Sequence, residues 1–81
     1  MIFGEAYDYT NFNSLDNEWI KYDGELKKDS KNGFGKLFLA NGEYFEGEFV
    51  NDSIDGNGDF YRLKGGVITG EWNKGLLKKI I

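Results

Sequence analysis

The residues of this chain with the most chemical potential are its 14 carboxylates, because it contains neither histidine nor cysteine. General acid–base catalysis most often uses histidine, and thiolate chemistry requires cysteine. Paired carboxylates can replace them only in a pocket that perturbs their pKa values. The sequence indicates no scaffold for such a pocket, so we expect no catalytic residues and no cofactor.

Two local motifs suggest ligand chemistry and fail on inspection. Residues 51–62 resemble a calcium loop in part, but Asn51 at the first position is uncharged and Arg62 stands at the twelfth, where a bidentate Glu is needed. A hairpin turn explains the same residues, so we expect no metal. The Gly-x-Gly segments 33–35 and 56–58 lack the third glycine and the helix of a dinucleotide-binding fingerprint.

The net charge of −4 is arranged in blocks. Residues 43–59 carry six acids and no base, whereas residues 60–81 carry five bases and one acid, Glu71. An acidic middle disfavours nucleic acid and anionic membranes as partners, and it is compatible with a basic protein surface. The alternative is a solvated acidic face that keeps a small sheet soluble.

The elements that must position these residues follow from an internal repeat. Residues 22–26 (YDGEL), 45–49 (FEGEF) and 68–72 (ITGEW) share one pattern at a constant step of 23. A second pattern, in residues 33–37 and 56–60, keeps the same step. Agreement of several positions on one period indicates a repeat architecture.

Each repeat predicts a β-hairpin. Residues 19–27 alternate in the manner of a strand, with Ile20, Tyr22, Gly24 and Leu26 on one face and Trp19, Lys21, Asp23 and Glu25 on the other. We expect a turn at 29–32 and a return strand at 35–39, followed by an Asn41-Gly42 turn. Strands 43–49 and 58–63, joined through 51–56, repeat the hairpin, and residues 67–72 begin a third copy that is not completed.

The two ends depart from the period. Residues 2–9 predict a strand in a degenerate opening repeat, and residues 10–18 a polar connection with one helical turn capped by Asn13 or Ser14. In residues 76–81, four aliphatic residues at i, i+1, i+4 and i+5 would share one side of a short helix. We expect this tail to cap the open end of the sheet; a separate binding segment is the alternative.

This pattern resembles the MORN repeat, over residues 19–75. The resemblance implies an all-β fold, a single elongated twisted antiparallel sheet of consecutive β-hairpins, which here has a short C-terminal capping segment. It also implies a scaffold or protein-binding role, and some members of the family are linked to membrane lipids. The departures are Asp29 and Asp52 at turn glycines, Ile68 at an aromatic position and Arg62 at an apolar one. We expect one domain, 1–81, divided into a cap (1–18), repeats (19–42, 43–65), a partial repeat (66–75) and a capping tail (76–81).

Residues 23 apart should stack in ladders across the sheet. One face then gathers the groove or core aromatics: Tyr22, Phe45, Phe49, Phe60 and Trp72. Leu26 would stack with Phe49 and Trp72, and a row of glycines would leave a groove between the large side chains. A single-layer sheet has no second layer to cover this face, so curvature, the tail, a second copy or a partner must do so.

The opposite face carries aromatic side chains among charges, which is typical of an interaction surface. The candidate partner-binding residues are Trp19, Phe38, Tyr44, Tyr61, Glu46, Glu48, Asp52 and Asp55. Cross-strand aromatic pairing that only steadies the sheet is the alternative interpretation.

We therefore expect a cytoplasmic, non-catalytic protein that docks on a larger protein and occludes or inhibits it. Its richness in Asn, Lys and Ile suits an A+T-rich microbial or viral genome, and this is compatible with a phage-type inhibitor of a host enzyme. Two alternatives remain. One is a self-associating scaffold protomer, in which unpaired sheet edges form a homodimer. The other is association with a membrane surface through Lys74, Lys78, Lys79 and the aliphatic tail.

Overall fold

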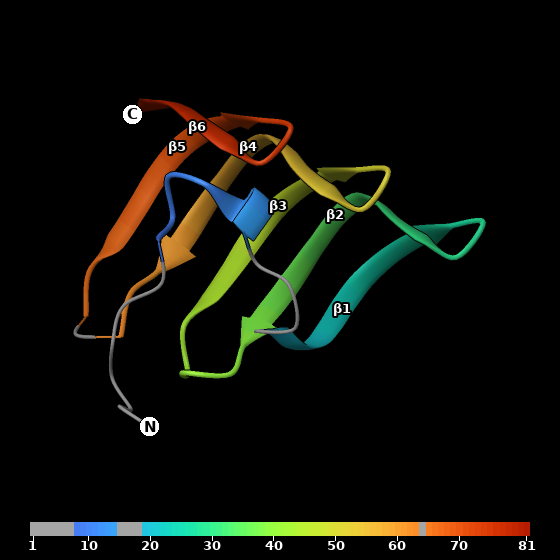
Figure 1. The fold of residues 1–81 in the computed structure, drawn as a ribbon, viewed down its shortest axis with the longest axis horizontal. Coiled ribbons are helices and arrows are strands. Elements are labelled where there is room, and N and C mark those ends of the chain that lie inside the picture. The colour runs from blue at the N-terminus through green and yellow to red at the C-terminus, as the bar shows by residue number, and fades with distance from the viewer. Residues whose placement is uncertain (1–7, 15–18, 64) are drawn as a thin grey trace.

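The computed structural model describes residues 8–14, 19–63 and 65–81. Its elements are a 3-10 turn, η1 (Phe12–Ser14), and six strands: β1 (Trp19–Lys27), β2 (Ser30–Leu39), β3 (Tyr44–Val50), β4 (Ser53–Tyr61), β5 (Val67–Asn73) and β6 (Leu76–Ile80). The strands form one open antiparallel sheet in chain order (Figure 1). The all-β prediction is confirmed.

Each hairpin is closed by a two-residue turn, and the three turns keep the 23-residue step. They are Lys28-Asp29, Asn51-Asp52 and Lys74-Gly75, and all six residues have positive φ. Turns with two left-handed residues match the twist of the flanking strands, and Asn and Asp tolerate that conformation. The longer turns expected at 29–32 and 51–56 are therefore wrong, and the return strands begin earlier, at Ser30 and Ser53.

The C-terminal tail is a strand, so the predicted helix is wrong and the third hairpin is complete. Gly75 supplies the left-handed turn residue 23 positions after Asp52. The chain then returns along β5 as β6, with Leu77 packed on the core and Leu76 and Ile80 exposed. The spacing of the aliphatic residues in 76–81 fits one side of a helix and a strand equally well. The two-residue turn at Lys74-Gly75 directs the chain into a strand.

The return strands of the first two hairpins contain a bulge. The pairs Gly24–Gly35 and Leu26–Lys31 place one residue of β1, Glu25, against three of β2. Gly33 has a φ of 90°, and a Glu25 Oε1 atom accepts the N–H of Phe34 at 2.8 Å. Gly56, Glu48 and Asn57 repeat this arrangement at a step of 23. In the third hairpin Lys79 occupies the glycine position, and the register shift is smaller.

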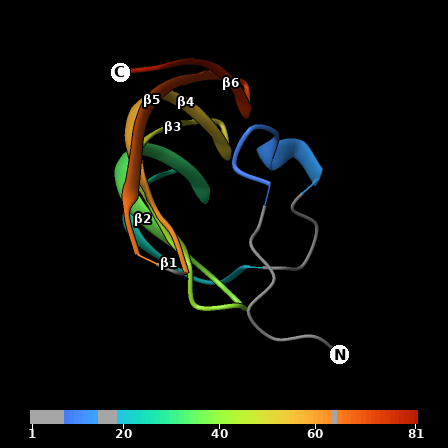
Figure 2. The same ribbon diagram turned by 90° about the vertical axis from the view of Figure 1, so that its left-hand side faces the viewer.

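The sheet is curved, and one face of it forms the core (Figure 2). This core face carries buried hydrophobic residues from β2 to β5: Leu37, Leu39, Phe45, Phe49, Ile54, Phe60 and Trp72. We refer to the opposite face as the outer face. Leu26, which the repeat places beside Phe49 and Trp72, is 62% exposed at the sheet edge instead, because its cross-strand partner is Lys31.

The N-terminal segment, residues 9–12, covers the core face. The Phe12 ring is buried and lies 5.6 Å from Phe45, 5.7 Å from Phe60 and 6.0 Å from Trp72, each in an edge-to-face arrangement. Aromatic pairs prefer this geometry. In Figure 2 the segment lies inside the curve of the sheet.

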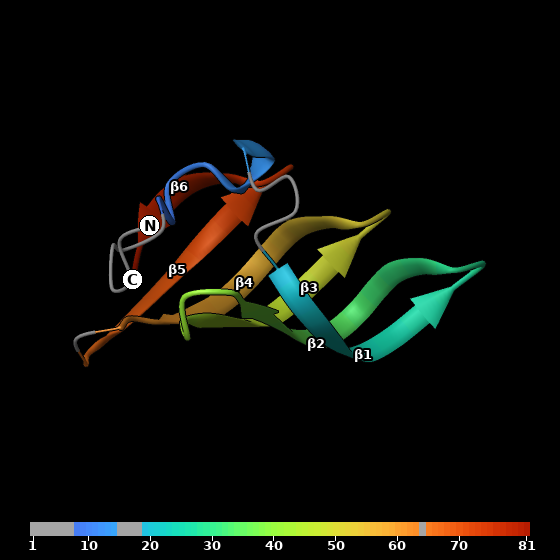
Figure 3. The ribbon, with the colours of Figure 1, turned by 60° about the horizontal axis from the view of Figure 1, so that its bottom comes forward.

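Main-chain hydrogen bonds hold this segment against the last hairpin. The N–H of Phe12 donates to the Gly75 carbonyl at 2.7 Å, and the N–H of Leu77 donates to the Thr10 carbonyl at 2.9 Å. The Trp72 Nε1 donates to the Tyr9 carbonyl at 2.8 Å. The N-terminal segment and β6 therefore lie together at one end of the sheet (Figure 3).

Two predictions for the N-terminus need correction. The helical turn is capped by Asn11, whose Oδ1 accepts the N–H of Asn13, rather than by Asn13 or Ser14. The strand expected over 2–9 lies mostly outside the described residues, and Asp8 and Tyr9 are not in a strand.

The glycine row on the core face is filled rather than open. Five glycines face one another across the sheet: Gly24, Gly35, Gly47, Gly58 and Gly70. A Cβ atom on Gly35 would lie 2.6 Å from the Tyr22 ring, and one on Gly58 would meet the Phe45 ring. The glycines therefore leave room for these rings to lie along the sheet, and the expected groove is part of the core.

Consecutive hairpins also join at their turns. The Lys31 N–H donates to Asp52 Oδ1 at 2.8 Å, and the Asp52 N–H donates to the Lys31 carbonyl at 3.0 Å. The ammonium of Lys31 lies 3.7 Å from the same carboxylate. The hydrogen bond from the Lys31 backbone, with smaller help from its ammonium, lowers the pKa of Asp52.

Replacing Phe12→Ala should lower the free energy of unfolding by about 3 kcal/mol or more, because the substitution leaves a cavity over three aromatic rings. Denaturant titration measures this. The matched control is Phe34→Ala, since Phe34 is 56% exposed, and its effect should stay within about 1 kcal/mol. Equal losses in the two variants would show that Phe12 does not close the core.

Gly47→Ala should lower the free energy of unfolding by about 3 kcal/mol, because the new Cβ would lie 2.6 Å from both the Gly58 Cα and the Asn57 carbonyl oxygen. Gly65→Ala is the control: its Cβ would enter open space, and only the positive φ is strained, at about 1 kcal/mol. Thermal unfolding followed by circular dichroism separates the two. A Gly47 variant as stable as the Gly65 variant would contradict this account of the glycine row.

The lowered pKa of Asp52 predicts a pH-dependent stability. Its carboxylate stabilises the fold fully above about pH 4, which is near the pKa of an ordinary aspartate. This stabilisation is lost as the pH falls through the lower pKa that Asp52 has in the folded state. Relative to the wild type, Asp52→Asn should therefore lose more free energy of unfolding at pH 7 than at about pH 2. The difference should be less than about 1 kcal/mol because the group is exposed. The preference of Asn for the turn conformation does not vary with pH, so a pH-independent deficit would refute the linkage.

Candidate functional site

Three aromatic side chains form a continuous row on the outer face. The cross-strand pairs Phe38–Tyr44 and Tyr44–Tyr61 place them side by side on β2, β3 and β4. The Tyr44 and Tyr61 rings are stacked, with centroids 4.3 Å apart and planes at 13°, and the Phe38 ring lies 5.6 Å from Tyr44. We call these three residues the aromatic row. All three are half-buried, so part of each ring remains accessible.

Two lysines extend over one end of the aromatic row. The Lys36 ammonium lies 5.3 Å from the Tyr44 ring centroid and 5.9 Å from that of Phe38. Lys21, on β1, lies 5.6 Å from the Phe38 centroid. Cation–π attraction of this kind holds the lysine heads against the rings and leaves the β4 end of the row open to other contacts.

Carboxylates border the aromatic row on β3 and β4. Glu46 and Asp59 are directly opposite each other in the antiparallel pair, where like charges are unfavourable. The Tyr61 hydroxyl donates to Glu46 Oε1 at 3.5 Å, and the Thr69 hydroxyl donates to Asp59 Oδ1 at 2.8 Å. Partial burial raises the pKa of Tyr61, and the Glu46 and Asp59 carboxylates raise it further. The Tyr61 end of the row therefore lies beside negative charge, whereas the Phe38 end lies beneath two ammonium groups.

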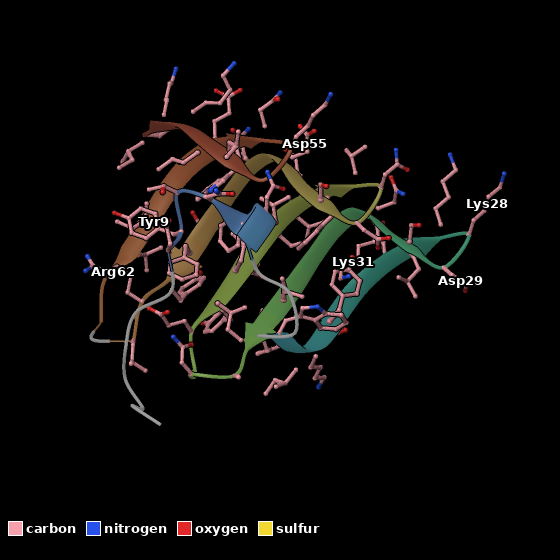
Figure 4. The ribbon with its side chains drawn as sticks, viewed as in Figure 1. Tyr9, Lys28, Asp29, Lys31, Asp55 and Arg62 are labelled. Carbon is pink, nitrogen blue, oxygen red and sulfur yellow. The ribbon has the colours of Figure 1, made fainter. Side chains whose placement is uncertain are left out.

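The remaining candidate acids do not all join this group. One carboxylate oxygen of Glu48 accepts a hydrogen bond from the N–H of Asn57 in the bulge. Asp52 belongs to the turn contact with Lys31. Asp55 lies near the start of β4, whereas Tyr61 ends that strand, and six residues of strand span about 20 Å (Figure 4).

Trp19 is on the core face, so its assignment to the aromatic outer surface is wrong. It pairs with Leu39, and Ile20 is an extra residue between the Trp19–Leu39 and Lys21–Phe38 pairs. Because a bulge shifts the alternation of side chains, Trp19 changes face. The Lys31 ammonium lies 4.4 Å from its ring centroid.

Lys31 and Trp19 border a hollow of about 200 Å³ on the core face. Its apolar walls include Phe12, Phe49 and Ile54. Lys31 occupies the ladder position that Ile54 and Leu77 fill in the next two repeats. Figure 4 shows Lys31 on the same side of the sheet as η1, while Lys28 and Asp29 mark the tip of the first turn.

Sequence reasoning missed three residues of the outer surface and one buried group. Lys21, Lys36 and Asp59 lie beside the aromatic row, and the 23-residue step between Lys36 and Asp59 was a usable signal. Glu43, one of the six acids in residues 43–59, is buried after the β2–β3 turn, where its carboxylate accepts the Leu63 N–H and the Asn41 amide.

The described parts of the chain hold neither a group of metal-ligating side chains nor a membrane-spanning helix. Within residues 8–14, 19–63 and 65–81, no three His, Cys, Asp or Glu side chains are grouped so as to hold a metal ion. Over the same residues, no helix has the length and apolarity needed to cross a membrane. The outer surface instead offers stacked rings with carboxylates beside them.

The sequence profile of the MORN repeat matches residues 22–44 and 45–67, which together make up more than half of the chain. Each matched segment begins at the aromatic residue of a repeat, Tyr22 or Phe45, and ends at the first residue of the next hairpin, Tyr44 or Val67. MORN repeats serve as modules for protein binding or membrane association. The chain therefore belongs to the MORN repeat family.

Proposed function

We propose that this protein binds another protein through its outer face and that it occludes or inhibits the surface it covers. The observation that carries the proposal is the aromatic row, partly exposed on the solvent side of the sheet, with Glu46 and Asp59 beside it. Protein interfaces are enriched in tyrosine and phenylalanine at their centres and have polar rims. Tyrosines in such places are frequent hot spots.

The charges around the row favour a basic partner. Glu46 and Asp59 face each other, so an approaching arginine or lysine would relieve their repulsion. A guanidinium can stack on a tyrosine ring and bond a carboxylate at the same time. The sheet offers both groups within one patch on β3 and β4, and this supports a partner that presents arginine.

The alternative that the aromatic row only steadies the sheet makes a different prediction. Cross-strand aromatic pairs contribute about 0.2–1 kcal/mol each to stability. The core face already contains the buried rings that stabilise the fold. If the row were only structural, its removal would lower stability slightly and change no binding.

The test is affinity capture from a lysate of the source organism with the whole chain as bait, followed by binding measurements with the purified partner. We expect Tyr44→Ser with Tyr61→Ser to weaken binding at least about a hundredfold, since each ring is a candidate hot spot. Affinity should also fall as salt is raised, because the surface is acidic. If the partner is an enzyme, its activity should fall as the chain saturates it.

Ile80→Ser provides the control, since Ile80 is an exposed apolar residue on β6 whose cross-strand partner, Gly70, belongs to the core face rather than the outer face. This variant should bind as the wild type does, and circular dichroism should show all variants folded. Unchanged affinity in the double tyrosine variant, or affinity that rises with salt, would contradict the proposal.

A further inference from the structure

The two ends of the aromatic row differ in what lies next to them. At the β2 end, the chain's own Lys36 places its ammonium 5.9 Å from the Phe38 ring centroid. At the β4 end, the cross-strand partner of Tyr61 is Val67 on β5, and Val67 is 47% exposed. A cation of the chain therefore lies over the rings at one end, and a short aliphatic side chain follows them at the other.

One face of the Tyr61 ring is turned toward β5. The rings of Tyr44 and Tyr61 are stacked with their planes at 13°, so Tyr44 covers the β3 side of Tyr61. Among the described residues, Tyr44 is the only ring stacked on Tyr61. Val67 comes 23 residues after Tyr44, so the third repeat has a valine where the second has a ring. Because valine is too short to cover a tyrosine ring, the place of a fourth ring lies open above it.

Asp59 and Thr69 border the same place further along β4 and β5. Asp59 is two residues before Tyr61, and its cross-strand partner is Thr69. Residues two apart on one face of a strand are separated by about 7 Å, and directly opposite residues by about 5 Å. The Thr69 hydroxyl donates to Asp59 Oδ1 at 2.8 Å, which orients the carboxylate. An open ring face and an oriented carboxylate therefore lie within reach of one side chain.

The charge of this part of the outer face fits a cation. Strands β3, β4 and β5 contain no lysine or arginine. Glu46 and Asp59 are directly opposite each other on β3 and β4. Arg62, the first base after β4, follows Tyr61 and lies on the opposite face by alternation, since its N–H still pairs with the Gly66 carbonyl across the hairpin. A cation that approached the β5 side of Tyr61 would therefore meet negative charge.

A guanidinium fits this geometry better than an ammonium does. It is planar, so it can lie parallel to the Tyr61 ring while the N–H groups in its plane bond a carboxylate. An ammonium is a compact and strongly hydrated point charge that has no face to stack on a ring. A neutral ring could stack in the same place, but it would gain nothing from the Asp59 carboxylate.

We propose that the β5 side of Tyr61, above Val67, is an arginine subsite. A guanidinium of the partner stacks on the Tyr61 ring in the place of a fourth ring and donates to the Asp59 carboxylate. The subsite rests on the proposed function, because it assigns the side chain that the partner protein places at this end of the aromatic row.

NMR titration of the whole chain with blocked tripeptides tests the subsite without a partner. The probe is acetyl-Gly-Arg-Gly-amide, and the matched probe contains citrulline, which keeps the planar shape and has no charge. We expect the arginine peptide to shift the amide signals of Tyr61, Val67 and Thr69. It should bind about tenfold more tightly than the citrulline peptide. Peptides with lysine or phenylalanine in the same position should also bind more weakly.

Val67→Tyr should weaken binding of the arginine peptide about tenfold, because the new ring takes the place of the guanidinium. Asp59→Asn should weaken it about threefold, because it removes the charge of the acceptor. Val50→Tyr is the matched control, since Val50 is an exposed valine on β3 that about 20 Å of strand separates from Tyr44. This variant should bind the peptide as the wild type does, and circular dichroism establishes that every variant is folded.

Four results would each overturn the subsite: equal binding of the arginine and citrulline peptides, tighter binding of the phenylalanine peptide, signal shifts away from Val67, or wild-type binding by Val67→Tyr. The captured partner separates the subsite from the proposed function. If the double tyrosine variant loses the partner and Val67→Tyr keeps it at full affinity, the subsite is wrong and the proposed function stands. If the double tyrosine variant keeps the partner, the proposed function is wrong.

Discussion

A sheet of one layer must bury one face without a second layer, and this constraint governs the molecule. Curvature brings the large side chains of the core face toward one another, and the N-terminal segment fills the space that remains. Phe12 is the central contact, because its ring touches aromatic residues from β3, β4 and β5 in edge-to-face geometry. The main-chain bonds of residues 9–12 to Gly75, Leu77 and Trp72 fix that ring in place and cover the β6 edge as well. One short segment therefore closes the core and protects an edge.

The backbone provides the curvature at positions where glycine or a left-handed residue is required. Gly33 and Gly56 accept the unusual φ of the bulges, and the carboxylates of Glu25 and Glu48 hold the freed N–H groups there. The third hairpin has Lys79 in place of the glycine, and its bulge is correspondingly smaller. A bulge increases local twist and bend. The larger bulges therefore add twist and bend in the first two hairpins, and the last hairpin lies against the N-terminal segment.

The 23-residue period made most of the fold predictable, because strand, turn and core positions recur with it. Three of the features that the sequence did not predict correctly have identifiable physical reasons. The tail was mistaken for a helix because Leu76, Leu77, Ile80 and Ile81 satisfy both helical and extended patterns. Trp19 was placed on the wrong face because the alternation of side chains along the strand does not reveal the bulge at Ile20. The covering role of Phe12 was missed because a single aromatic residue in a polar segment has no periodicity. On the outer face, the aromatic row was predictable from parity, whereas the placement of Lys36 over its rings depends on side-chain conformation.

The way the core is closed also decides where recognition can take place. Since the chain's own Phe12 occupies the centre of the core face, a partner that entered there would have to displace a buried ring and three hydrogen bonds. The outer face imposes no such requirement, because its rings are already partly exposed and are held in register by the same backbone pairs that align the core. Phe38 and Tyr61 are 23 residues apart, as are Leu37 and Phe60 immediately beside them. A single repeat therefore sets both faces at once: one residue of each neighbouring pair stabilises the sheet, and the other remains available for contact with a partner.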